Sequence, residues 1–237
     1  MKLVCCNFKM NLLKKDIDNY LNIINDKIDK ENIIFFPSIP YINYFKENGY
    51  IVGSQNISFQ EFGSITGDTS IIQLKELGIS YALIGHSERR KYFDEDKYIT
   101  KKIKLTLENN IKVILCIGES IKASEEETNL FLKEEIDDAI ENNISLINNN
   151  NLIIAYEPIW SIGSGVIPDN NCLIETISFI KKYILETYKL DLKVLYGGSV
   201  NLDNIKNLEN INQIDGYLIG GASLNPEDFL SLLSNIK

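Results

Sequence analysis

Short apolar runs alternate with longer, more polar segments along the whole sequence. Each run is long enough for one buried strand, and most of the segments between them carry helical periodicity or helix-start signals. The apolar runs lie near residues 2–6, 33–36, 50–53, 80–84, 111–116, 152–156, 192–196 and 214–219. Eight such strand-then-helix units in 237 residues predict a closed (β/α)8 barrel of parallel strands with outer helices, rather than an open sheet. No linker rich in Pro, Ser or Gly interrupts the series, so we expect residues 1–237 to form a single α/β domain.

The net charge and the apolar pattern exclude several classes of partner. A net charge of −9 argues against nucleic-acid binding, because a phosphate backbone requires a basic surface. An anionic substrate would need a locally positive site, because the net negative charge of the chain repels it. No apolar run approaches the roughly 20 residues of a membrane span, and the first strand pattern begins at once, which leaves no room for a signal peptide. We therefore expect no membrane partner.

Cysteine usage predicts a reducing, cytoplasmic location. The four cysteines are few and irregularly spaced, so they do not form the pattern of a disulfide framework. They are Cys5, Cys6, Cys116 and Cys172. The sequence has a single histidine and no Cys-x-x-Cys pair, which argues against a metal site.

Residues able to take part in catalysis or ligand binding follow five of the predicted strands. In a (β/α)8 barrel, catalytic groups gather at the C-terminal ends of the strands. The segments at these ends are Asn7-Phe8-Lys9, Gly85-His86-Ser87-Glu88-Arg89-Arg90, Glu157, Gly197-Gly198-Ser199 and Gly220-Gly221-Ala222-Ser223. We therefore expect these five segments to converge on one functional site.

Glu157 is the first candidate for a catalytic group. It emerges where the apolar run 152–155 ends, and the following Pro158 biases it toward an extended conformation. The segment after it finishes in glycines, which allow a loop backbone to approach a ligand. An isolated Glu-Pro pair is more often a solvated acid before a surface loop. The complementary chemistry at the other strand ends favours a catalytic carboxylate.

His86 is the only histidine in the chain. A lone histidine is more often structural or exposed than catalytic. Here it lies at a strand end, before a polar segment able to start a helical turn. Backbone N–H groups there would disfavour a protonated ring and leave a neutral imidazole as a hydrogen-bond donor.

Lys9 is the candidate cation of the site. It lies beside the first strand and would face an anionic ligand, although a surface lysine is an equally common outcome. At ~4 Å and an effective dielectric of ~20, one charge pair is worth roughly 4 kcal/mol before desolvation. Glu88 can pair with Lys9 and fix its position, whereas we expect Arg89 and Arg90 to be structural ion-pair partners.

Two glycine-rich turns follow the last two predicted strands, at 197–199 and 220–223. Glycines allow backbone N–H groups to surround an anion, and helix starts behind them add positive potential. Such barrels often hold phosphate after strands seven and eight. A single Gly-Gly turn is usually only a turn, but two in these positions predict a phosphate site.

Motifs across nearly the whole chain resemble those of the triosephosphate isomerase family, in its order and at its spacing. These motifs are Asn7-Phe8-Lys9-Met10-Asn11, Gln55-Asn56, Gly67, residues 84–90, Cys116-Ile117-Gly118-Glu119, Tyr156-Glu157-Pro158-Ile159-Trp160, Tyr196-Gly197-Gly198-Ser199-Val200 and Gly220-Gly221-Ala222-Ser223. The resemblance implies a TIM barrel that interconverts dihydroxyacetone phosphate and D-glyceraldehyde 3-phosphate without cofactor or metal.

The resemblance also implies a role for each matching residue. Glu157 would be the base that moves a proton between C1 and C2. Neutral His86 would polarise the carbonyl and shuttle protons between the oxygens. Lys9 and Asn7 would stabilise the enediolate and help to hold the substrate. The backbone groups expected at the phosphate belong to Gly163, Ser199, Gly220 and Gly221. Supporting roles are expected for Ser87, Glu88 and Tyr196.

Two further segments resemble functional loops of the family. The lid expected to close over the substrate comprises Pro158, Ile159, Trp160, Ser161, Ile162, Gly163, Ser164, Gly165, Val166, Ile167 and Pro168. Residues 59–66 resemble the loop that inserts into a second subunit, with Thr66 near the partner's Asn7. A homodimer is therefore the expected form.

The far hinge of the expected lid departs from the family pattern. It reads Val166-Ile167-Pro168, where Lys-Thr-Ala is common. In the family, the tyrosine equivalent to Tyr196 bonds to the backbone N–H of the last hinge residue when the lid is shut. Proline has no N–H, so we predict that Tyr196 cannot form this latch and that closure depends more on Ser199 with the Gly165 backbone.

Two alternative functions remain open at this point. A Schiff-base aldolase would use Lys9 as its nucleophile, and borohydride with substrate would then label that lysine. A non-catalytic barrel kept for binding would show no turnover, although the sequence retains every catalytic residue type expected of an isomerase.

Overall fold

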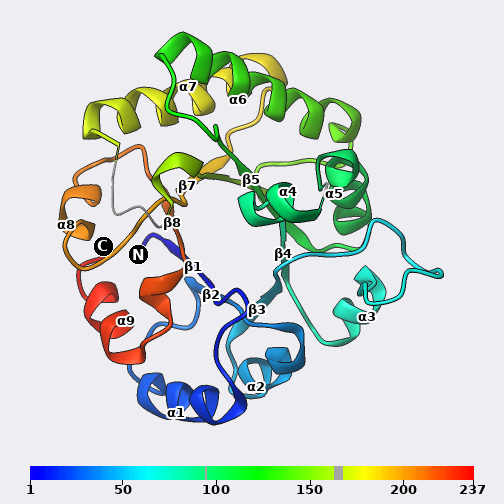
Figure 1. Ribbon diagram of the computed structural model, residues 1–237, viewed down its shortest axis with the longest axis vertical. Coiled ribbons are helices and arrows are strands. Elements are labelled where there is room, and N and C mark those ends of the chain that lie inside the picture. Colours follow the sequence, from blue (N-terminus) through cyan, green and yellow to red (C-terminus); the bar gives the residue numbers. More distant parts are fainter. Residues whose placement is uncertain (94, 163–167) are drawn as a thin grey trace.

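Parallel strands close into a barrel at the centre of the molecule (Figure 1). The computed structural model describes residues 1–93, 95–162 and 168–237. The strands are β1 (Leu3–Asn7), β2 (Ile33–Phe36), β3 (Ile51–Ser54), β4 (Tyr81–Ile84), β5 (Lys112–Ile117), β6 (Leu152–Tyr156), β7 (Lys193–Tyr196) and β8 (Gly216–Ile219). Neighbours in sequence are neighbours in the sheet, and β8 pairs with β1, so the barrel has no open edge. The predicted (β/α)8 barrel is confirmed.

Helices surround the strands, and α4 lies inside their ring (Figure 1). The α-helices of the described residues are α1 (Lys14–Ile24), α2 (Ile42–Glu47), α3 (Ile71–Glu76), α4 (Ser87–Phe93), α5 (Ile99–Glu108), α6 (Glu125–Ile140), α7 (Asn170–Tyr188), α8 (Ile205–Leu208) and α9 (Pro226–Leu233). Short 3-10 helices are η1 (Ile39–Tyr41), η2 (Glu95–Tyr98), η3 (Glu141–Asn143), η4 (Ile159–Ser161) and η5 (Gly221–Ser223). Helix starts follow local sequence: Ser70 and Ser124 form capping boxes, and the Asn225 side chain accepts from Asp228 N–H.

Alternation along each strand divides the core into two layers. In β1, Cys5 packs inside the barrel with Ile34 and Leu218, whereas Cys6 packs outward beneath the helices. The outer layer includes the fully buried Phe8, whose ring lies 5.3 Å from that of Tyr20 and 5.5 Å from that of Phe45. Packing on both faces explains why the strands are continuous apolar runs in the sequence.

The strand ends occur within about a residue of the predicted ones, and this fixes where the site residues emerge. The predicted run 33–36 coincides with β2, while the predicted 50–53 is observed at 51–54. Among the helices of the described residues, none combines the length and apolarity that crossing a membrane demands. Cys5, Cys6 and Cys116 are buried and Cys172 is exposed, all as free thiols.

Candidate active site

A carboxylate and the imidazole meet at the C-terminal ends of β6 and β4. Glu157 Oε1 lies 3.2 Å from His86 Nε2, and Glu157 Oε2 accepts a hydrogen bond from Ser87 N–H at 3.1 Å. Glu157 is 2% exposed and His86 5% exposed. The barrel thus brings Glu157 next to His86 and to Ser87, which is 70 positions away in the sequence.

The start of α4 determines the orientation of the His86 ring. The backbone N–H of Glu88 donates to His86 Nδ1 at 3.2 Å. Since Nδ1 is the acceptor, a neutral ring carries its proton on Nε2, the atom that faces Glu157. The imidazole can therefore donate one hydrogen bond toward the barrel mouth.

Two glycines leave room for Glu157. A Cβ atom at Gly118 would lie 1.8 Å from the Glu157 carbonyl oxygen, and one at Gly197 would lie 2.9 Å from Glu157 Cγ. Gly118 also has a φ of +155°, outside the range that other residues adopt readily. The close approach of β5 and β7 to the end of β6 therefore requires glycine at both positions.

Lys9 is held by its backbone and aimed by its side chain. Its φ is +51°, and its N–H donates to Asn7 Oδ1 at 3.0 Å. Its carbonyl accepts from Ser38 Oγ at 3.0 Å and from Gln55 Nε2 at 2.8 Å. The Lys9 ammonium forms the expected ion pair with Glu88, at 2.8 Å.

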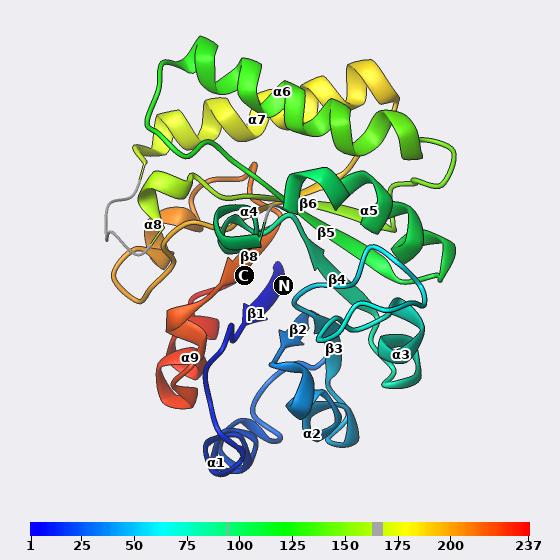
Figure 2. The same cartoon turned by 45° about the vertical axis from the view of Figure 1, so that its right-hand side comes forward.

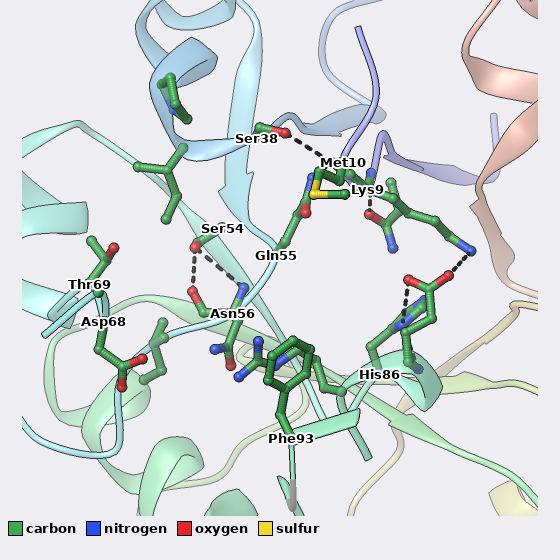
Figure 3. Close-up of a pocket in the computed structure, with 17 residues that line it drawn as sticks. Lys9, Met10, Ser38, Ser54, Gln55, Asn56, Asp68, Thr69, His86 and Phe93 are labelled. Atoms are coloured by element: carbon green, nitrogen blue, oxygen red, sulfur yellow. Dashed lines mark hydrogen bonds and ion pairs between the residues drawn. The ribbon is translucent and has the colours of Figure 1, made fainter. Parts of the chain in front are cut away.

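Lys9 separates two cavities at the mouth of the barrel. Figure 3 shows its side chain on the same side of the first cavity, of about 430 Å³, as His86. The second, of about 630 Å³, is lined by Ser199, Gly220 and Gly221, and also by Asn201 and Leu202. Residues predicted to hold a substrate head group and its phosphate thus lie on either side of one cation.

The described part of the expected lid packs against β7. Ser199 Oγ donates to the Ser161 carbonyl at 2.9 Å. Burial raises the pKa of Tyr196 to about 12, an effect that the nearby Ser161 side chain partly opposes. Pro168 is buried. Gly163, Ser164, Gly165, Val166 and Ile167 lie outside the described residues.

Glu119 and Gln55 take part in the site, although the sequence assigns them no role. Glu119 accepts hydrogen bonds from Trp160 Nε1 at 2.7 Å and from Tyr156 OH at 3.1 Å, and burial raises its pKa. Gln55, the residue after β3, supports the Lys9 carbonyl. Both residues lie in motifs that resemble the family's, and each is a polar residue within two positions of a strand end, but these signals give them no particular role.

Thr66 does not lie beside the site residues of its own chain. It is exposed in the segment between β3 and α3, which projects beyond the ring of helices at the right of Figure 1. Arg89 and Arg90 form ion pairs, as expected, with Glu95 and with Asp96.

The fold and this geometry define a (β/α)8-barrel enzyme equipped for proton transfer. A family model described as triosephosphate isomerase matches residues 2–236. Relatives named triosephosphate isomerase include those of Alkaliphilus oremlandii, 34% identical over 98% of both chains, and Buchnera aphidicola, 36% identical over 99% of this chain and 98% of the relative. That of Dictyostelium discoideum is 36% identical over 97% of this chain and 93% of the relative. The chain belongs to the triosephosphate isomerase family.

Proposed function

We propose that this chain interconverts dihydroxyacetone phosphate and D-glyceraldehyde 3-phosphate by proton transfer through an enediol(ate), a reaction of glycolysis and gluconeogenesis. One observation carries the proposal: the Glu157 carboxylate lies 3.2 Å from His86 Nε2, beside a lysine at the mouth of the barrel. A carboxylate can remove a proton from carbon while the imidazole donates to the adjacent oxygen. Membership of the family supports the same reaction.

In the proposed mechanism, Glu157 removes a proton from C1 of dihydroxyacetone phosphate. The C–H electron pair forms the C1=C2 bond, and the carbonyl π pair moves to O2. His86 donates a hydrogen bond to that oxygen, and Lys9 and Asn7 stabilise its developing charge. His86 gives its Nε2 proton to O2 and takes the proton of O1. The O1–H electron pair then forms the C1=O bond, and the C1=C2 pair takes the proton that Glu157 returns to C2. Ser87 N–H holds the base at 3.1 Å in the resting site, so substrate must displace this contact.

The second cavity is the proposed phosphate site. Ser199, Gly220 and Gly221 line it together with Lys9, and a Cβ atom at Gly220 would lie 3.3 Å from Lys9 Cε. The phosphate would therefore bind through backbone N–H groups close to the cation. Gly163, proposed as a further donor, lies outside the described residues.

A coupled assay that starts from D-glyceraldehyde 3-phosphate tests the proposal, and no turnover would overturn it. Borohydride reduction in the presence of substrate distinguishes the Schiff-base alternative. The Lys9 ammonium is ion-paired with Glu88 at 2.8 Å, and an ammonium has no lone pair for carbonyl attack. We therefore expect no labelling of Lys9.

Tyr196→Phe is expected to keep activity within about tenfold of the native enzyme, since a neutral hydrogen bond contributes about 0.5–1.5 kcal/mol. The physical reason is the hinge proline, Pro168, which offers no N–H for the Tyr196 hydroxyl. Steady-state kinetics measure the effect. A loss of about a hundredfold or more would show that this hydroxyl holds the closed lid by another contact.

We also propose a homodimer, with residues 59–66 of each chain inserted beside the partner's active site. Three features support it: Phe62 on this projecting segment is 72% exposed, Met10 at the rim of the first cavity is 96% exposed, and that cavity is lined by Asn7 and Lys9. Light scattering is expected to give twice the 27.0 kDa of one chain, and Thr66→Arg is expected to shift the mass toward the monomer. A native monomer would contradict the proposal.

The free thiols support a proposed cytoplasmic location, and the continuous barrel supports the proposal that residues 1–237 act as one domain. Cell fractionation would test the first, and a single cooperative unfolding transition would test the second.

A further inference from the structure

A largely buried ion pair lies behind the catalytic groups, and neither of its residues lines the two cavities. Arg90 on α4 and Glu135 on α6 meet through Nη1 and Oε1 at 2.9 Å, with side chains 16% and 10% exposed. α4 lies inside the ring of helices, whereas α6 belongs to that ring (Figure 2 shows α6 along the outside). The pair therefore links an outer helix to the helix that carries the residues after His86.

Arg90 joins the ends of two strands. Its Nε donates to the Gly85 carbonyl at 2.7 Å, and its Nη2 donates to the Cys116 carbonyl at 2.9 Å. Gly85 directly precedes His86, and Cys116 lies in β5. A Cβ atom at Gly85 would lie 3.0 Å from Arg90 Nη2 and 3.1 Å from the Cys116 oxygen, so the junction is tightly packed. One planar guanidinium thus fixes the spacing of β4 and β5 beside the imidazole.

Glu135 contacts the residue that packs against the backbone of Glu157. Its Oε2 accepts the Gly118 N–H at 2.8 Å. Gly118 is the residue whose Cβ would lie 1.8 Å from the Glu157 carbonyl oxygen, and the Glu157 N–H donates to Ile117 O at 2.8 Å. A shift of the Gly118 peptide would therefore move the backbone of Glu157.

We propose that the Arg90–Glu135 pair is a positioning device that sets the separation of the Glu157 carboxylate from the His86 imidazole. It rests on the proposed function, in which both groups act on one substrate. Arg90 fixes the imidazole through Gly85, and Glu135 fixes the base through Gly118. A displacement of about 1 Å at reacting groups costs about a hundredfold in rate, so such a device affects turnover without touching substrate.

The charge of Glu135 makes the device sensitive to pH. Burial raises the pKa of Glu135 to about 7, with smaller increases from Asp96 and Glu119, while Arg90 and a backbone N–H oppose the rise. Cys116 also faces this carboxyl, and burial keeps its pKa well above the usual range, so it remains a neutral thiol. Protonation of Glu135 weakens its bond to Arg90, so we expect turnover to fall as the pH drops through about 7.

The same pKa gives the sign of the effect on stability. The folded value of about 7 lies above the ordinary value of 4.5, so the folded chain binds more protons than the unfolded chain between them. The stability that Glu135 contributes is therefore lost as the pH rises through this range. At pH 8, Glu135→Gln removes an unfavourable buried charge, and Arg90 keeps Asp96 as a partner. Its Tm is expected to be unchanged or higher.

Glu135→Gln, compared with Glu134→Gln on the exposed neighbouring position of α6, tests the proposal. At pH 8 we expect a kcat about ten- to a hundredfold lower for Glu135→Gln, with KM within about twofold and no loss of Tm. The fall in rate near pH 7 should disappear. The chain has one histidine, so its imidazole NMR signal reports on His86 alone and should shift in ligand-free Glu135→Gln but not in Glu134→Gln.

A kcat equal to that of Glu134→Gln, or a reduced kcat with an unmoved His86 signal, would overturn the proposal. If Glu135→Gln does not fold, Arg90→Lys decides. Lysine keeps the charge but lacks the planar fork that donates from Nε to the Gly85 carbonyl and from Nη2 to the Cys116 carbonyl. It should lower kcat at constant KM, and unchanged kcat would count against the device. If the native protein has no isomerase activity, the proposed function is wrong. The His86 signal of Glu135→Gln would still test whether the Arg90–Glu135 pair positions the imidazole.

Discussion

Glu157→Asp is expected to lower kcat by about a hundredfold or more and to change KM far less. A positioned general base contributes about 10²–10⁴-fold, and a displacement of about 1 Å costs about a hundredfold. Aspartate keeps the charge but is one methylene shorter. The carboxylate would therefore lose its 3.1 Å contact with Ser87 N–H and its 3.2 Å approach to His86. Because the base acts in the transition state, its loss appears in kcat rather than in binding.

The matched control is Glu175→Asp, the same shortening at an exposed position of α7. Neither substitution changes the net charge, and kcat is measured well below the unfolding temperature of both variants. The coupled assay, run in both directions with native protein and both variants, measures the effect. A Glu157→Asp enzyme within about tenfold of the native kcat would show that another group removes the proton.

The positions of the strands could be predicted from sequence because of how a closed parallel barrel is buried. Both faces of each strand are covered, so β2 and β6 are uninterrupted apolar runs whose ends are sharp. The site follows from the same property. Carboxyl ends of parallel strands share one rim, so polar residues at 86 and 157 had to come close together.

The supporting contacts could not be predicted, because no local pattern encodes them. Gly118 and Gly197 look like ordinary turn glycines, and only the neighbouring ends of β5, β6 and β7 show that each makes room for Glu157. Arg90 and Glu135 are 45 positions apart, and a glutamate on a helix is usually exposed. The buried pair of Lys102 and Glu95, at 2.7 Å, is hidden in the sequence for the same reason. Helical periodicity predicts which face of a helix is buried, but not which charged residue of another helix pairs with it.

Lys9→Gln is expected to lower kcat/KM by about a hundred- to a thousandfold, with much of the loss in KM. One charge pair at ~4 Å and an effective dielectric of ~20 is worth roughly 4 kcal/mol before desolvation, and each 1.4 kcal/mol is about tenfold. The chain carries a net charge of −9, so a phosphorylated substrate depends on local positive charge. Without Lys9, the Glu88 carboxylate would also face the substrate unpaired, which adds repulsion.

The rigid setting of Lys9 separates this effect from a general change of charge. Contacts from Asn7, Ser38 and Gln55 hold its backbone at a φ of +51°, so the side chain is aimed between the two cavities before substrate arrives. Lys182→Gln, at an exposed position of α7, lowers the net charge by the same amount. Steady-state kinetics at two salt concentrations should leave Lys182→Gln within about twofold of native, because charges beyond about 10 Å are screened at 0.1 M salt. Equal losses in both variants would mean that the overall field, rather than this one ammonium, attracts the substrate.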